Sequence, residues 1–534
     1  MTLRLLASIT LLVPLLAPLQ LRAAPAPAEQ QALHVLNRIA YGPRPGDIER
    51  VNAMGVRRYI ETQLEPSALA YPPELDARLR ALDVPNRPAG AVLEEFTELR
   101  REVRDEEEGA KKRRQQGVAA MSLQTSQARV LRALESPRQL EEVLVDFWFN
   151  HFNVYFDKGD TRPLVASYER DAIRPYVFGN FRDMLGATAK HPAMLYYLDN
   201  YVSAAPQAPA PAKPGAARPK ARGGVNENYA RELMELHTLG VNGGYSQHDV
   251  SELARMLTGW TYDKKALMRD NETFRFDPKR HDRGVKTWMG RQVGDQGQAE
   301  GEYALDVLAV HPATARHLST KLAQYFVQDE PPRALVDKMA RTWLDSSGNI
   351  RAVLRTLLTS DEFMAPASVG AKFKTPYQFV LSAARASAAP SVNITPLLNT
   401  MSALGMPLYG CQTPDGYKNT QAAWLNPDAL SRRIAFASAL AEGRLPLAQA
   451  PAPTPAETMG GAMMAGSMMA AAPVTPAAPA APPAPAAPPV KLDPVTLAST
   501  LGPAMSARTQ GLVAASPVNL RAALLLGSPD FMQR

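Results

Sequence analysis

The chain of 534 residues is 46% hydrophobic and 21% charged, so it is long and apolar enough to bury one large core or two ordinary ones. Cys411 is the only cysteine, which excludes an intrachain disulfide and leaves packing as the source of stability. The formal net charge is +7, but no basic stripe interleaved with aromatic residues is found, so the charge indicates a solvated surface and no binding of nucleic acid.

Residues 1–24 have the pattern of a secretory signal peptide. Arg4 supplies the positive end, residues 5–19 form an apolar run that is short for a membrane span, and the small residues Ala23 and Ala24 follow. An uncleaved N-terminal anchor is the alternative interpretation. No later stretch is apolar enough to cross a bilayer. We therefore predict a periplasmic or secreted protein without a membrane span after signal cleavage.

Apolar residues recur at helical spacing through most of the mature chain, which predicts a mostly α fold. We expect a large multi-helix body with two low-complexity inserts and at most one small β-hairpin or ordered loop, over residues 274–293. The predicted segments are a helical N-terminal part over 29–202, a Pro/Ala-rich insert over 203–224, a second helical part over 225–449, an Ala/Pro/Met insert over 450–490 and a C-terminal helical segment over 491–534 that packs on the body.

The sequence FWFNHF follows a helix start at Ser136-Pro137 and is too aromatic to face solvent. Trp148 and Phe152 are four residues apart and share one helix face, so we predict that both are core residues. Asn150 and His151 are candidate substrate-binding residues. The alternative for His151 is a buried imidazole bonded to a backbone carbonyl.

Residues 226–262 combine several carboxylates with histidine and arginine, on two predicted helices joined by a glycine turn. Ser246 and Asp249 have the spacing of a capping box at the start of the second helix. Trp260, near the end of this stretch, is a further candidate for substrate binding.

The first of these helices carries Glu227, Arg231 and Glu235 at i, i+4 spacing, which a solvated, salt-bridged face also produces. Glu232 differs because it borders the apolar face, where a carboxylate needs a partner or has a raised pKa. Two carboxylates with unlike surroundings can divide acid and base roles, as glycoside hydrolysis requires. We therefore predict Glu232, with Glu227 and Arg231, as catalytic residues.

The loop FDPKRHDRGVK places His281 beside Asp282, with Lys286 close by. A histidine oriented by an acid suits a general base or a metal ligand, so His281 and Asp282 are predicted as catalytic and Lys286 as substrate-binding. A turn held by side-chain hydrogen bonds is the alternative. Our hypothesis is that Glu232 and His281 meet in one cleft.

No metal or cofactor is assigned from the sequence, because the histidines lack the HExxH spacing of strong metal motifs. A scattered set could still converge on one ion: His151, Glu232, Glu235, His237, His281 and Asp282. Cys411 is a formal nucleophile candidate, but we expect a buried or incidental thiol. The methionine cluster within residues 450–490 suits copper(I), against the alternative of a flexible insert. There is no GxSxG elbow and no phosphate-binding glycine loop.

Several stretches, in order along the chain, carry a resemblance to a known family. They are HVLNRIAYGPRPGDI, FWFNHF, HPAMLYYLDN, NENYARELMELHTLGVNGGYSQHDVSELARMLTGWTY, FRFDPKRHDRGVKTWMG, HPATARHLSTKL and LGSPDFMQR. With these motifs the chain resembles the bacterial family called domain of unknown function 1800 over nearly its whole mature length. The family has no established activity, so no catalytic residue is carried over. Its members are often encoded beside another exported family, domain of unknown function 1501, which implies a protein of that family as a partner.

Three function classes remain open at this point. The first is a secreted or periplasmic hydrolase of an envelope or extracellular polymer that uses Glu, His and Asp for acid–base chemistry, which we favour. The second is a non-catalytic envelope protein that binds a co-exported partner. The third is a metal-binding periplasmic protein. A groove lined by acid–base residues favours catalysis, whereas a flat apolar surface favours the binder.

Overall fold

The computed structural model describes residues 28–101, 108–206, 224–448 and 491–534. The predicted fold class is confirmed, because helices dominate and the described strands form only two small antiparallel pairs. No helix in these residues is both long and apolar enough to cross a membrane. The predicted signal peptide and the methionine cluster lie outside the described residues.

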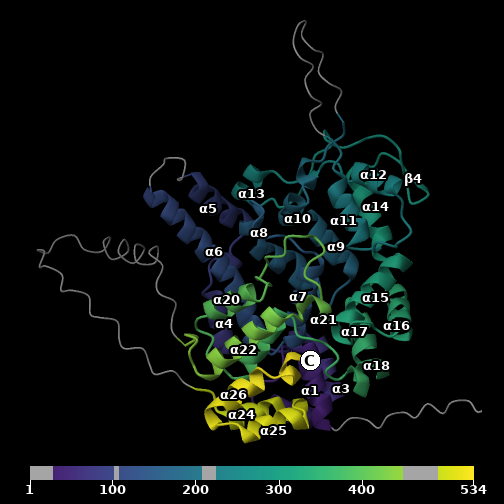
Figure 1. The fold of residues 1–534 in the computed structure, drawn as a ribbon. Helices are drawn as coiled ribbons and strands as arrows, with labels where there is room; N and C mark the ends of the chain where they lie inside the picture. Colours follow the sequence, from purple (N-terminus) through teal and green to yellow (C-terminus); the bar gives the residue numbers. More distant parts are fainter. Residues whose placement is uncertain (1–27, 102–107, 207–223, 449–490) are drawn as a thin grey trace, which may run out of the picture.

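The first half of the chain contributes helices that surround the aromatic helix α7 (Figure 1). They are α1 (Ala28–Ile39), α2 (Asp47–Met54), α3 (Val56–Leu64), α4 (Pro73–Arg80), α5 (Ala89–Arg101), α6 (Glu108–Glu135), α7 (Gln139–His151), α8 (Thr161–Ser167), the π-helix η4 (Tyr168–Ile173), α9 (Phe181–Lys190) and α10 (Pro192–Tyr197), with short 3-10 turns η1 (Pro66–Ala68), η2 (Val84–Asn86), η5 (Arg174–Tyr176) and η6 (Asn200–Val202).

The middle of the chain adds all four strands and the charged helix pair α11 and α12. Its elements are α11 (Glu227–Glu235), α12 (Gln247–Met256), β1 (Trp260–Thr261), α13 (Lys264–Asp270), β2 (Arg275–Phe276), β3 (Lys286–Trp288), β4 (Arg291–Val293), α14 (Gln298–Ala309), α15 (Pro312–Phe326), α16 (Arg333–Asp345), α17 (Ile350–Leu358), α18 (Asp361–Met364) and η7 (Pro366–Ser368). Strand β1 pairs with β2 and β3 with β4, so residues 274–293 form the ordered, hairpin-containing segment predicted from the sequence.

The last part of the chain returns to the N-terminal helices. It comprises α19 (Pro376–Ala386), α20 (Thr395–Ala403), α21 (Gln421–Trp424), α22 (Pro427–Ala441), α24 (Pro494–Leu501), η8 (Gly502–Ala504), α25 (Ala507–Ala515), α26 (Val518–Leu526) and α27 (Pro529–Met532). Helices α24 to α26 lie beside α1 and α22 (Figure 1). Leu526 and Phe531 are buried, and Arg534 exchanges backbone hydrogen bonds with Lys372.

A single large core joins residues from both ends of the chain, from Ala32 to Met532. Trp148 and Phe152 lie at its centre with no exposed surface, which confirms the prediction for the aromatic helix. The helix itself begins at Gln139, later than the start predicted at Ser136, because Gln139 uses its side-chain amide to cap the carbonyls of Ala133 and Ser136.

The start of α12 is set by residues close to it in the sequence. Ser246 and Asp249 form the predicted capping box of α12. Ser203 and Ala204 are buried, so the body extends two residues into the segment predicted as the Pro/Ala-rich insert.

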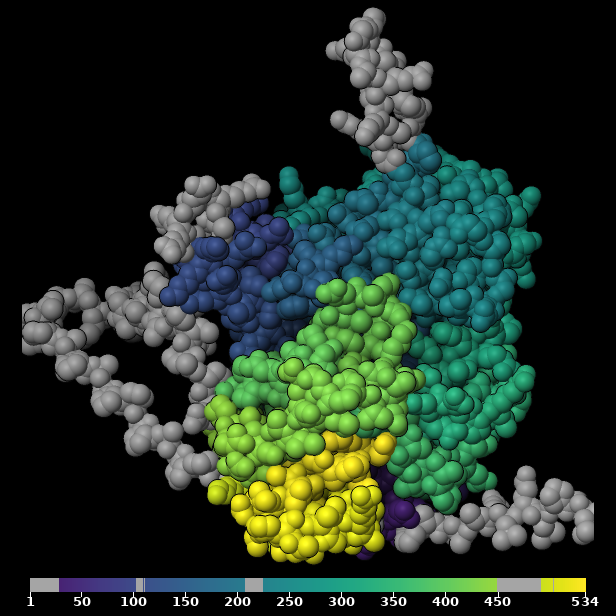
Figure 2. Space-filling model, in the orientation of Figure 1, coloured from purple at the N-terminus to yellow at the C-terminus, as the bar shows by residue number. Residues whose placement is uncertain are grey.

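In Figure 2 the light-green surface around residue 420 lies on the front of the molecule, against the blue and teal surface behind it.

Candidate functional site

Polar side chains gather in two places, an open pocket and a largely buried network. The first group lines an open pocket between α7, α11, α15 and the loop of residues 405–420, and we call it the lysine pocket. Its polar lining includes Asn150, His151, Glu235, His317, Lys321 and Asp415, around a volume of about 240 Å³. The second is a chain of hydrogen bonds under α12 and β3, which we call the histidine network. It consists of Glu252, Arg255, His281, Asp282, Lys286 and Glu300.

The loop over the lysine pocket is fixed to α7 by two asparagines. The Asn150 amide donates to the Tyr417 carbonyl at 2.9 Å and accepts from the Tyr417 amide at 2.7 Å. Asn153 donates to two further carbonyls of the loop. Gly416 has φ +71° and would place a Cβ only 2.2 Å from the Asn150 carbonyl oxygen, so only glycine permits this approach. The loop wall is therefore held in place by α7.

Lys321 and His151 form the central contact of the lysine pocket. The Lys321 Nζ lies 2.9 Å from His151 Nδ1, and His151 Nε2 donates to the His237 carbonyl at 3.1 Å. Because a carbonyl only accepts, the His151 Nδ1 is the acceptor for the Lys321 amine. Among the described residues, no carboxylate forms an ion pair with Lys321. The alternative predicted for His151, a buried ring bonded to a backbone carbonyl, is thus present, and the same ring also contacts the pocket lysine.

The environment of Lys321 disfavours its charged form. Burial and then the nearby Lys418 lower the pKa of Lys321 to about 8, against a smaller opposite effect of Asp415. The adjacent rings are neutral near pH 7, because burial and then Lys321 lower the pKa of His317 to about 4 and that of His237 to about 3. A lysine in this state exchanges its proton within the physiological pH range.

Asp415, which acts on Lys321, and Glu232, which Asp415 also influences, have opposite pKa shifts. Burial raises the pKa of Asp415, but hydrogen bonds from Lys418, at 2.6 Å, and Thr413 outweigh it and hold the pKa below its usual value. Burial and then Glu235 raise the pKa of Glu232, and Asp415 adds to this. Among the described residues the Glu232 carboxylate has no hydrogen-bond or ion-pair partner. One carboxylate is therefore kept ionised and the other is biased toward its acid form.

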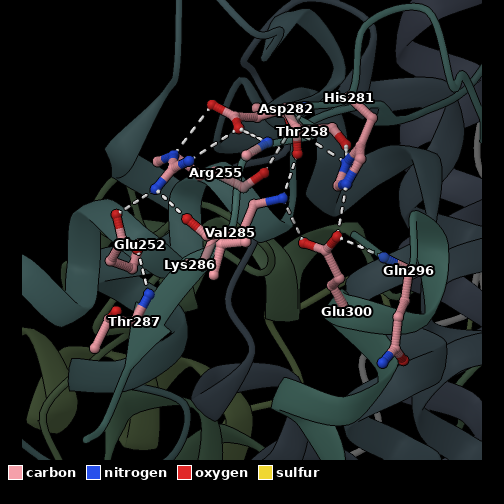
Figure 3. Close-up of polar contacts among 11 residues, drawn as sticks. Glu252, Arg255, Thr258, His281, Asp282, Val285, Lys286, Thr287, Gln296 and Glu300 are labelled. Carbon is pink, nitrogen blue, oxygen red and sulfur yellow. Dashed lines mark hydrogen bonds and ion pairs between the residues drawn. The ribbon is translucent and has the colours of Figure 1, made fainter. Parts of the chain in front are cut away.

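The histidine network surrounds a lysine with no exposed side-chain surface (Figure 3). The Lys286 Nζ lies 2.7 Å from Glu300 Oε2 and also donates to the Asp282 carbonyl. His281 Nε2 lies 3.1 Å from Glu300 Oε1, and its Nδ1 lies 2.9 Å from the Thr258 carbonyl. Both ring nitrogens of His281 are therefore hydrogen-bonded, and the Lys286 ammonium has one carboxylate and one carbonyl partner.

Arg255 extends the histidine network to the surface of α12. Its guanidinium contacts both carboxylate oxygens of Asp282 at 3.0 and 3.1 Å and Glu252 at 2.7 Å. Glu252 in turn accepts from the Thr287 amide at 2.6 Å. These bonds connect α12 with the His281 loop and β3, so the network joins three segments of chain.

A metal site was one possibility for the predicted histidine loop. His281, Asp295 and Glu300 each place a ligand atom within 4.8 Å of the others. However, the Lys286 ammonium already supplies the positive charge beside Glu300, and the His281 nitrogen that would bind an ion is hydrogen-bonded to the same carboxylate. These residues do not fit a divalent cation, because a second cation would be repelled by Lys286.

Glu227, Arg231 and Trp260, which were also predicted as site residues, belong to neither the lysine pocket nor the histidine network. Glu227 pairs with Arg231 at 3.3 Å on the surface and accepts hydrogen bonds from Gln247 and Ser251 of α12, so it joins the two helices. Trp260 is fully buried, against Phe274. Buried side chains such as those of Trp260 and Lys286 leave no surface for a substrate to contact.

The structure gathers His281, Asp282 and Lys286 in the histidine network, and Asn150 and His151 in the lysine pocket. Glu232 has its electrostatic neighbours in α11 and the 405–420 loop, whereas His281 has its partners in Thr258, just after α12, and in Glu300 of α14. No hydrogen bond or ion pair joins Glu232 to His281 within the described ranges. Their sharing of one cleft stays a prediction.

Sequence reasoning missed Lys321, although a signal for it exists. Leu318, Leu322 and Tyr325 are buried at positions i, i+4 and i+7 of α15, and Lys321 occupies i+3 on the same face. A charged residue inside an apolar stripe indicates either a partner or a function. Its contact with His151 spans 170 positions of sequence and could not be read from spacing.

Comparison with known proteins gives one result on family. A family model described as "Protein of unknown function (DUF1800)" matches residues 34–533. The chain belongs to this family. The match spans both the lysine pocket and the histidine network, so both lie within the region common to the DUF1800 family model. No curated protein and no solved structure matches the chain.

Proposed function

We propose that this protein is a hydrolase of an envelope or extracellular polymer, with its chemistry in the lysine pocket. The observation that carries the proposal is the Lys321–His151 contact, because Lys321 faces an open pocket and forms no ion pair with any carboxylate of the described residues. Exported location rests on the signal-peptide pattern of residues 1–24 and forms part of the same proposal.

Hydrolysis requires one group that takes a proton from water and another that gives a proton to the leaving group. Lys321 suits the first role, since its pKa of about 8 allows a neutral amine at mildly alkaline pH. Glu232 suits the second, since burial and its acidic neighbours raise the pKa of its carboxyl. His151 orients the Lys321 amine, and Asn150 holds the loop that closes the pocket.

The test uses purified full-length protein and fluorescently labelled cell-envelope polymers, with release of soluble fragments as the readout. We expect Lys321→Met to lower the release rate by at least about 100-fold, the usual size of a general-base contribution. Glu232→Gln is expected to lower it by a similar factor. Lys338→Met is the matched control, because Lys338 is an exposed lysine on α16.

Wild-type release that exceeds the Lys321→Met rate, with Lys338→Met unchanged, supports the proposal. Equal release by wild type and Lys321→Met, or no release from any envelope polymer, contradicts it. Melting temperatures of all variants show whether a loss of rate comes from unfolding.

A second function, binding of a co-exported partner, is favoured by a separate observation. Leu512 of α25 and Val518, Leu520 and Leu524 of α26 are exposed apolar residues, with Leu512 and Val518 each about 60% exposed. A protein of the domain of unknown function 1501 family is the proposed partner. Co-purification of the two proteins tests this function. The double variant Leu512→Ser with Leu520→Ser is expected to reduce the amount of partner recovered.

A further inference from the structure

A large hollow lies where the ends of α5 and α6 approach α10, η6 and the start of α13. Helix α5 packs against both α8 and α13, so the α5–α6 pair lies beside these elements (Figure 1). Two adjoining hollows, of about 420 and 890 Å³, share Arg100 and Arg114 in their walls and therefore form one cleft. We call it the basic tyrosine cleft. It has no lining residue in common with the lysine pocket.

Positive charge dominates the described walls of this cleft. The ionisable lining residues are the cations Arg100, Arg101, Lys111, Arg114, Arg162 and Lys264 and the carboxylates Asp157 and Asp160. The Asp160 carboxylate is shared by Lys264, at 2.7 Å, and Arg100, at 3.5 Å. Asp157 is paired with Arg162. Both carboxylates are thus already neutralised.

The two remaining arginines face the cleft without an anionic partner. Arg101, at the end of α5, and Arg114, near the start of α6, are exposed, and no hydrogen bond or ion pair holds either guanidinium among the described residues. Guanidinium groups bind carboxylate and phosphate in a bidentate geometry. Two unpaired arginines at one cleft therefore indicate an anionic ligand.

Three tyrosines form the opposite wall. The rings of Tyr196 and Tyr201 stack at 5.2 Å, and Tyr201 packs at 5.8 Å against Tyr262. None of the three hydroxyls has a hydrogen-bond partner within the described residues. Because the rings are stacked on one another, they offer the ligand mainly edges and hydroxyl groups. Such a wall suits a polyol better than a nucleobase, which needs a free aromatic face.

We infer that the basic tyrosine cleft binds an acidic glycan, whose carboxylate, sulfate or phosphate groups contact Arg101 and Arg114 and whose hydroxyls meet Tyr196, Tyr201 and Tyr262. The larger hollow of the cleft, about 890 Å³, is within the range typical of ligand pockets. Helix α10 also connects this cleft to the lysine pocket, since Tyr196 faces the cleft while the hydroxyl of Tyr197 donates to the Gln412 carbonyl of the pocket loop.

The binding experiment is independent of any hydrolysis. Fluorescence anisotropy at low salt measures the affinity of the full chain for labelled carboxylated, sulfated and phosphorylated oligosaccharides. A neutral oligosaccharide of equal length and a single-stranded DNA of similar charge are the comparison probes. The test variant is Arg101→Ser with Arg114→Ser. Its matched control is Arg57→Ser with Arg58→Ser, which removes the same charge from two exposed arginines of α3.

At least one acidic glycan is expected to bind, the neutral one to bind at least about tenfold more weakly, and the Arg101/Arg114 variant to lose at least about tenfold in affinity, as expected for charge-assisted hydrogen bonds. Arg101→Lys with Arg114→Lys is expected to recover part of the lost affinity. The Arg57/Arg58 control retains wild-type affinity within about twofold. Tyr201→Phe weakens binding by a few-fold through its lost hydroxyl.

Three results overturn the inference. They are failure of every acidic glycan to bind, equal losses in the Arg101/Arg114 variant and the Arg57/Arg58 control, and DNA binding as tight as that of the best glycan. The same glycans are measured with Lys321→Met, which is expected to bind normally. The glycan-binding result and the hydrolase proposal therefore fail separately.

Discussion

The lysine pocket and the histidine network contain similar residue types but differ in whether their charges are paired. In the network, Lys286 is fully buried and forms an ion pair with Glu300, and both His281 nitrogens are hydrogen-bonded. In the pocket, the hydrogen-bond partner of Lys321 within the described part of the chain is the neutral imidazole of His151. Paired buried charges fix three segments of chain together, whereas an unpaired amine beside an open volume is available for a ligand. The density of charged residues alone does not distinguish the two.

The largest expected loss of stability comes from a substitution that breaks the histidine network. Glu300→Ala strands the Lys286 ammonium in the interior, and removing one partner of a buried pair costs about 3–5 kcal/mol. The free energy of unfolding, from urea denaturation, should fall by this amount. Asp295→Ala is the control, because Asp295 is exposed, and should change it little. Equal small effects of both variants would show that the network does not stabilise the fold.

A smaller loss is expected at the wall of the lysine pocket. Asn150→Ala removes two hydrogen bonds to Tyr417 and should lower the free energy of unfolding by about 2 kcal/mol. Hydrogen exchange of the 405–420 backbone should accelerate, because the loop loses its attachment to α7. Asn228→Ala provides the comparison, since that exposed side chain donates a single long hydrogen bond, of 3.4 Å, to the described residues. Unchanged exchange in Asn150→Ala would mean that the loop is held by other contacts.

Lys321→Met is expected to stabilise the protein by about 1 kcal/mol near pH 7 while it abolishes function. The folded pKa of Lys321, about 8, is below its unfolded value near 10.5, so the unfolded state binds more protons between these values. Wild-type stability should therefore gain a rising contribution from Lys321 as pH increases from about 8 to 10.5. The stability of wild type relative to Lys321→Met, measured by urea denaturation across this range, should rise steadily with pH. A difference that stays constant would show that Lys321 has an ordinary pKa.

The smallest effect is expected on the solvated face of α11. Glu227→Gln breaks an ion pair in which both side chains are 39% exposed, and exposed pairs contribute less than about 1 kcal/mol. The melting temperature should change by no more than a degree or two, and polymer release should stay near wild type. A large loss of release would move the catalytic centre toward Glu227 and away from Lys321.

Local features of the fold were predictable because they depend on near neighbours. The capping box at Ser246, the helix that buries Trp148 and Phe152 and the ordered segment over residues 274–293 all follow from spacing within a few residues. The burial of Cys411 agrees with its expected inert role.

The site residues were less predictable because their partners are distant in sequence. Asp282 was expected to orient His281, but its carboxylate pairs with Arg255 of α12, while His281 contacts Glu300. His151 and Lys321 meet only because α7 and α15 lie on either side of the pocket. The arginines of the basic tyrosine cleft that have no carboxylate partner among the described residues come from α5 and α6, and its tyrosines come from α10 onward, so no basic-aromatic stripe exists in the linear sequence.

The most direct test of the central claim is the pKa of the Lys321 amine. Purified protein is labelled briefly with an amine-reactive reagent across a pH series, and labelling of each lysine is quantified by mass spectrometry. We predict a midpoint near 8 for Lys321, against about 10.4 for a free lysine side chain in water. The midpoint of Lys321 should also match the alkaline rise of polymer release. A Lys321 midpoint at the free-lysine value would contradict its assignment as the base of the pocket.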